Sequence, residues 1–138
     1  MKDAVVKITD RHVQDGEEYT CELTTGGSLD FRPDGFTVVY HETDEELKGC
    51  KTELKYADGI IIMTRSGKYN TELIIEKDRR HSCFYATPYG ELIMGVYGKN
   101  IVSDMTEKGG TLCFRYTLDF NSMPASENEL KITVSVKE

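Results

Sequence analysis

Residues 112–120, LCFRYTLDF, place an apolar or aromatic side chain at every second position, and residues 130–136, LKITVSV, repeat the pattern. A period of two is typical of a β-strand that buries one face. These two segments are therefore predicted to be core strands. Their predicted buried positions are Leu112, Phe114, Tyr116, Leu118, Phe120, Leu130, Ile132, Val134 and Val136.

Glycine-bearing turn signals recur on both sides of these strands and separate short alternating segments. The signals are Asp15-Gly16, Gly26-Gly27, Asp34-Gly35, Asp58-Gly59, Gly67, Tyr89-Gly90 and Gly109-Gly110. The pattern predicts an all-β fold, an antiparallel meander of about 8–10 strands that forms one closed or nearly closed barrel. Residues 1–138 are expected to be a single domain. Only residues 41–49 and 121–130 favour a helical turn.

Two-residue turns also predict which residues face each other across a hairpin. Around Asp58-Gly59, the predicted pairs are Tyr56 with Ile61, Leu54 with Met63, and Thr52 with Arg65. Around Asp34-Gly35 they are Phe31 with Val38 and Leu29 with Tyr40, and around Gly109-Gly110 Asp104 faces Arg115. A bulge or bend is expected near Gly95 or Gly98, because the apolar parity changes between Val96 and Ile101.

Four polar residues share the inward side in this register: Tyr40, Glu42, Thr52 and Arg65. A buried carboxylate needs a cation or several hydrogen bonds, and Arg65 is the natural partner for Glu42. Two interpretations stay open. The pair closes one end of the barrel as a structural feature, or Arg65 anchors an anionic ligand that Glu42 orients or protonates.

Three classes of function follow. The first is binding of a small, partly apolar, anionic ligand in the barrel mouth. Its candidate residues are Arg65, Glu42, Tyr40, Thr52, Tyr85, Met94 and Tyr116, with Phe31 and Phe114 as further wall residues. The second is an enzyme without metal or organic cofactor, in which Glu42 is the acid or base and Arg65 holds a carboxylate.

The third class is a structural module with a filled barrel that associates with itself as a homodimer. Its contact surface would be the predicted outward apolar residues, which are Val39, Ile60, Ile62, Phe84 and Ile93. Residue types and spacings do not choose among the three classes.

Composition and net charge argue against some classes of binding partner. The chain of 138 residues carries 24 acidic and 17 basic residues, a formal charge of −7, which disfavours nucleic acid and anionic membranes. Neither a membrane-length apolar run nor a signal-peptide pattern is present, so a cytoplasmic protein is expected. The four cysteines are far apart in sequence and are expected to stay reduced, and no metal-ligand or nucleotide-loop spacing occurs.

Several short segments together resemble the YwiB-like family, a group of small bacterial proteins of unknown function. They are YHE at 40–42, Gly49, Thr52, TRSG at 64–67, TPYG at 87–90 and YTLDF at 116–120. The resemblance spans nearly the whole chain and implies a calycin-type, lipocalin-like barrel. It implies no activity, because the fold is shared by proteins with different functions.

Overall fold

A computed structural model gives the structure of the chain. It describes residues 2–41, 49–67, 70–87, 90–120 and 123–137; the side chains of residues 84–87, 92, 124 and 125 are outside this description. Within these ranges there are ten strands and no helix. The strands are β1 (Lys2–Gln14), β2 (Glu17–Arg32), β3 (Gly35–His41), β4 (Lys51–Ala57), β5 (Ile60–Ser66), β6 (Asn70–Glu76), β7 (Arg80–Thr87), β8 (Gly90–Ser103), β9 (Gly109–Phe120) and β10 (Met123–Val136).

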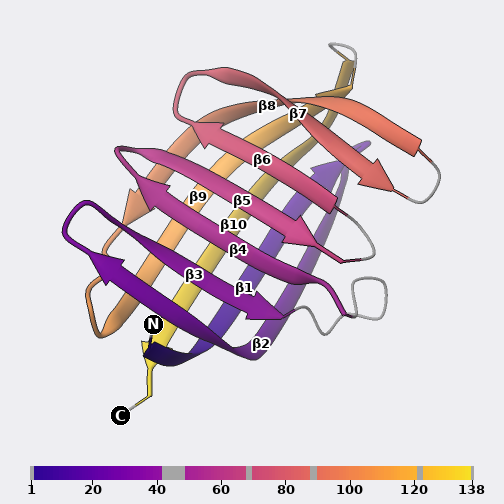
Figure 1. Ribbon diagram of the computed structural model, residues 1–138. Helices are drawn as coiled ribbons and strands as arrows, with labels where there is room; N and C mark the ends of the chain where they lie inside the picture. Colours follow the sequence, from indigo (N-terminus) through magenta and orange to yellow (C-terminus); the bar gives the residue numbers. More distant parts are fainter. Residues whose placement is uncertain (1, 42–48, 68–69, 88–89, 121–122, 138) are drawn as a thin grey trace.

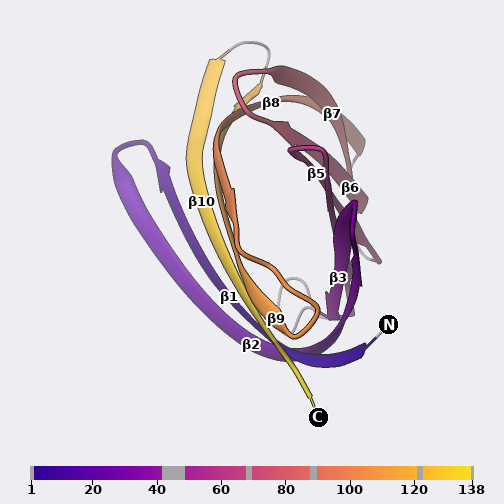
Figure 2. The ribbon, with the colours of Figure 1, turned by 90° about the vertical axis from the view of Figure 1, so that its left-hand side faces the viewer.

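Each strand pairs antiparallel with the next along the chain, and β10 pairs with β1 to close the barrel (Figure 1). The predicted all-β antiparallel meander barrel is thereby confirmed. Strands β1, β2, β8, β9 and β10 are long, whereas β3 to β7 have seven or eight residues each. In Figure 2 the tip of the β1–β2 hairpin stands apart from the other strands.

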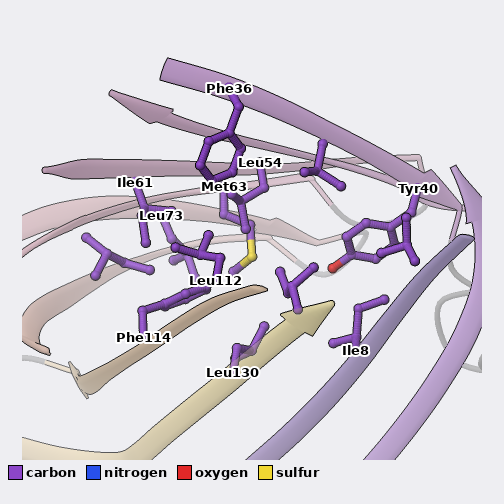
Figure 3. Close-up of a cluster of buried hydrophobic side chains, with 14 of the residues drawn as sticks. Ile8, Phe36, Tyr40, Leu54, Ile61, Met63, Leu73, Leu112, Phe114 and Leu130 are labelled. Carbon is purple, nitrogen blue, oxygen red and sulfur yellow. The ribbon is translucent and has the colours of Figure 1, made fainter. Parts of the chain in front are cut away.

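The alternating residues that defined the strands form the hydrophobic core inside the barrel. Leu112 and Phe114 of β9 are fully buried and belong to one core cluster with Leu54 of β4 and Ile61 of β5 (Figure 3). Ile132 of β10 is a further fully buried member of this cluster. Each such side chain contributes about 1.5–3 kcal/mol by leaving water. The core strands predicted from residues 112–120 and 130–136 are therefore found as β9 and β10.

The Asp58-Gly59 hairpin has the predicted register, with Leu54 opposite Met63 and Thr52 opposite Arg65. Asp58 and Gly59 both have positive φ, 52° and 77°, which is the backbone of a type I′ turn. This turn matches the right-handed twist of its strands, and the register follows from it.

The Asp34-Gly35 prediction was wrong by two residues, because the turn is Pro33-Asp34 and Arg32 faces Gly35. Proline favours the second position of a type I turn and glycine the fourth. Leu29 therefore faces Val38, and Phe31 faces Phe36. A shift of two conserves the parity of each residue, so the predicted inward faces survive the error.

The predicted Gly109-Gly110 turn was also displaced. Thr106 and Gly109 close the turn through two backbone hydrogen bonds of 2.8 and 3.0 Å. Arg115 consequently faces Asn100. Asp104, predicted to face Arg115, instead accepts a 2.6 Å hydrogen bond from the backbone N–H of Thr111.

The expected bulge is confirmed, since the β8–β9 register shifts between Gly98 and Asn100.

The predicted turn at Gly26-Gly27 was wrong, because both residues lie inside β2. A Cβ on Gly27 would collide with the carbonyl oxygen of Val39. Glycine marks a close approach of two strands here, as it does inside many strands. The described part of the second predicted helical segment, residues 123–130, is strand and belongs to β10.

The pairing of β6 with β7 is short, with two residue pairs, Asn70–Ala86 and Thr71–Tyr85. Beyond them the backbone N–H of Ile74 donates to the Cys83 sulfur at 3.4 Å.

All four cysteines are free; Cys50 and Cys83 are buried, Cys113 is half-buried and Cys21 is exposed.

Candidate functional site

A cavity of about 370 Å³ opens at the end of the barrel where β5 ends and β6 begins. All of its wall residues lie on the inward faces of β1, β5, β6, β8, β9 and β10. They are Asp10, Met63, Arg65, Thr71, Leu73, Met94, Tyr116, Leu118, Phe120 and Leu130. An apolar wall with a few polar groups is the usual composition of a small-molecule site.

Arg65 is positioned by the register of the short strands. It faces Thr52 on β4 and Thr71 on β6, and Thr52 in turn faces Tyr40 on β3. A continuous inward row of polar residues thus crosses four neighbouring strands. The arginine side chain is half-buried and reaches the cavity wall, where its planar guanidinium presents several N–H donors.

Asp10 is the second charged residue of the cavity wall, and sequence reasoning missed it. It stands on β1, opposite Leu130 of β10, and shares the inward parity of Val6 and Ile8. Its carboxylate Oδ1 lies 4.0 Å from Nδ1 of His12. The signal that points to it is the alternation of the segment AVVKITD, which ends in a carboxylate on the apolar side.

Tyr116 shares the cavity wall with Asp10 and Arg65, and both charges act on its phenol. It is buried, and its ring stacks on Phe114 with the centroids 5.9 Å apart. Burial raises the pKa of its phenol; the negative charge of Asp10 raises it further and the positive charge of Arg65 lowers it. The phenol therefore stays protonated at neutral pH and offers a hydrogen bond rather than a base.

Two other predicted site residues are buried beside this site without forming the cavity wall. Tyr40 and Thr52 are nearly or fully inaccessible, and Tyr40 also raises the pKa of Tyr116. Of the predicted site residues whose side chains are described, Arg65, Met94 and Tyr116 are the ones on the wall. The backbone of Tyr85 faces Thr71 and its side chain is outside the description.

Glu42, the proposed partner of Arg65, lies outside the described residues. Two predicted wall residues lie elsewhere. Phe114 is fully buried in the core, and Phe31 is 40% exposed beside a separate hollow formed with Lys2 and Glu107. Phe31 lies next to the turn that ends β2 and faces Phe36, whereas the predicted register had placed it opposite Val38.

Within the described ranges, no three histidine, cysteine or acidic side chains gather closely enough to hold a metal ion. The same ranges contain no helix long and apolar enough to cross a membrane.

An all-β closed barrel with a mixed polar and apolar hollow at one end places the chain in the class of small lipocalin-like barrels. The chain belongs to the family described as "Domain of unknown function (DUF1934)", which matches residues 6–132. This is the YwiB-like family that its sequence segments resemble.

A solved structure supports the fold assignment. The crystal structure of ywiB protein from Bacillus subtilis matches with a TM-score of 0.88 and 20% identity, over 99% of this chain and 93% of the other. Identity at that level shows the fold alone. A comparison with curated proteins found no match.

Proposed function

We propose that this barrel binds a small, partly apolar, anionic ligand in its open end, with Arg65 as the charge anchor. The observation that carries the proposal is the 370 Å³ cavity, in which Arg65 shares a wall with methionine, leucine and phenylalanine side chains. The volume is at the lower end of known small-molecule sites. A guanidinium in a partly water-excluded hollow favours a carboxylate or phosphate through charge-assisted hydrogen bonds.

Asp10 adds a second requirement. Its carboxylate repels a second anionic group and accepts a hydrogen bond, so it favours a ligand with a hydroxyl or amino donor beside its single acidic group. The phenol of Tyr116, held protonated, supplies one further donor. The ligand class is therefore a small monoanion with an apolar body and one polar donor.

The cavity also bears on the competing interpretations. A barrel filled along its whole length is disfavoured by a hollow of this size at one end. The enzyme interpretation depends on Glu42, which is outside the described residues, and the protonated phenol of Tyr116 adds no base. Of the three interpretations, ligand binding needs the fewest functional groups beyond those on the cavity wall.

The test is calorimetric titration with 3-phenylpropionate and other small monocarboxylates, each compared with its neutral amide. We expect each bound carboxylate to bind at least about tenfold more tightly than its amide, which corresponds to one lost charge-assisted interaction. Arg65→Leu should abolish that preference. Arg115→Leu, on the outer face beside Glu129, is the matched control and should retain it.

Thermal unfolding of both variants separates binding from folding. If Arg65→Leu is folded and keeps the carboxylate preference, or if wild type binds no carboxylate better than its amide, the proposal is wrong.

A further inference from the structure

The β1–β2 hairpin extends beyond the rest of the sheet and leaves one edge of β2 open (Figure 2). In the described chain, β3 pairs with β2 only from Gly27 to Arg32, whereas β1 pairs with it from Glu17 to Leu29. Among the residues that the structure describes, the stretch Glu17–Gly26 therefore has a strand on one side only. An open edge of this length is a template for another strand.

We propose that a second copy of this chain covers the edge, with β2 paired antiparallel to β2 about a two-fold axis at Cys21. None of the cavity-wall residues lies on β2, although Cys21 faces the wall residue Asp10 of β1. The edge also differs from the outward apolar face considered above. On that face, Glu53 of β4 stands opposite Val39 and Lys55 stands opposite Ile62, so charged residues interrupt the apolar row.

Backbone groups on the open edge are available to a partner. The turn at Asp15-Gly16 has positive φ at both residues, 52° and 76°, so Gln14 and Glu17 form the hydrogen-bonded pair that closes the hairpin. Hydrogen bonding alternates along an antiparallel ladder. The even-numbered residues Thr20 and Glu22 consequently direct N–H and C=O groups toward the open edge.

Charge selects the register of the two copies. A continuous two-fold sheet requires one residue to face its own copy. An axis at Thr20 places Glu18 against Glu22, and an axis at Glu22 places that glutamate against itself, both unfavourable like-charge pairs. An axis at Tyr19 or Leu23 leaves a shorter ladder.

The axis at Cys21 avoids these penalties. Glu22 then faces Thr20, Glu18 faces Thr24, and Tyr19 faces Leu23, so each glutamate meets a threonine and each tyrosine meets a leucine. The ladder spans Glu17 to Thr25 in both copies. The glutamates of the edge thereby exclude the neighbouring registers without blocking this one.

Disulfide formation between the two copies of Cys21 can test this register. The residue is exposed. It would face its own copy at a non-hydrogen-bonded site, where Cα atoms are about 4.5 Å apart. That separation is within the range of about 4.4–6.8 Å seen in disulfides. Diamide should therefore oxidise the two thiols to one disulfide, taking up their two electrons and two protons to become the hydrazine.

The first experiment compares three proteins by non-reducing electrophoresis after a brief diamide pulse. Wild type should form a covalent dimer and Cys21→Ser should not. The double variant Cys21→Ser/Thr24→Cys also carries its thiol at an exposed position. In the proposed dimer, however, the Cα atoms of the two residues at position 24 would be about 20 Å apart. It should form no covalent dimer and should run as a monomer on the gel. Equal cross-linking of wild type and the double variant overturns the proposal.

The second experiment uses charge at Thr20, which faces Glu22 of the other copy twice by symmetry. In sedimentation equilibrium under reducing conditions, Thr20→Lys should tighten the dimer and Thr20→Glu should weaken it, each by about 2- to 30-fold. Circular dichroism checks that both variants are folded. Equal effects of the two substitutions, or a monomer at every concentration in all three proteins, overturns the proposal.

Discussion

Asp10 and Arg65 lie on the wall of one cavity, although they belong to β1 and β5, which are not neighbours in the sheet. Their charges act on the same phenol with opposite sign: Asp10 raises the pKa of Tyr116 and Arg65 lowers it. The open end of the barrel is therefore a hollow of balanced charge rather than a purely cationic one. The proposed preference for anions should therefore be adjustable by a single substitution.

Asp10→Asn should strengthen the binding of small carboxylates. The change removes the negative charge that opposes an anion beside Arg65, and a like charge in a partly exposed site is worth about 1 kcal/mol, or about fivefold in affinity. Calorimetric titration with 3-phenylpropionate measures the effect. Asp30→Asn, outside the cavity beside Arg32, is the control and should leave the affinity unchanged. Weaker binding by Asp10→Asn would contradict this account of the cavity.

Tyr116 should make the protein sensitive to alkali. Its folded pKa is raised above the ordinary value of about 10, so its contribution to stability is complete below pH 10. Above that pH the unfolded phenol loses its proton while the folded one keeps it. The free energy of unfolding should then fall by up to about 1.4 kcal/mol per pH unit until the folded pKa is reached.

Urea unfolding between pH 8 and 11 tests this prediction. Tyr116→Phe should flatten the decline above pH 10, because the variant has no phenol to ionise. Tyr97→Phe, at an exposed position of β8, should follow the wild-type curve. The same pH dependence in Tyr116→Phe and wild type would show that another group causes the decline.

Much of the fold was predictable because errors of two residues conserve the face to which each side chain points. The hairpin at Pro33-Asp34 illustrates this, since Val38 and Tyr40 were placed against the wrong partners yet still point inward. The proline and the following aspartate and glycine support two turns. Proline at the second position and glycine at the fourth favour the observed one, which the Asp-Gly signal alone does not reveal.

The candidate site was less predictable, for a related reason. Thr52 and Arg65 belong to one hairpin with an Asp-Gly turn, so their pairing follows from local sequence. Asp10 reaches the same cavity only through closure of the barrel, which brings β1 to β10. Alternation identifies its inward face, but no local signal says which distant strands that face meets.

Gly98→Ala should destabilise the protein strongly. An added Cβ would collide with the backbone carbonyl of Glu76, where the chain after β6 packs on β8 through the 2.8 Å hydrogen bond from Asp78 N–H to the Gly98 carbonyl. Overpacking against backbone costs about 1–3 kcal/mol. Gly26→Ala is the control, because the space around that residue is open, and it should change stability by no more than about 0.5 kcal/mol. Chemical unfolding in urea compares the two variants, and equal stabilities would contradict the prediction.

The four thiols should react in an order set by their burial. Cys21 is exposed and should react with a disulfide reagent in a fast phase that Cys21→Ser removes. Burial raises the pKa of the Cys113 and Cys83 thiols, which lowers their thiolate fractions at pH 8 and slows their reaction. Cys50 and Cys83 are buried and should react only when the chain opens. Titration in denaturant without reductant should find four free thiols; fewer than four, or a fast phase that persists in Cys21→Ser, would contradict this order.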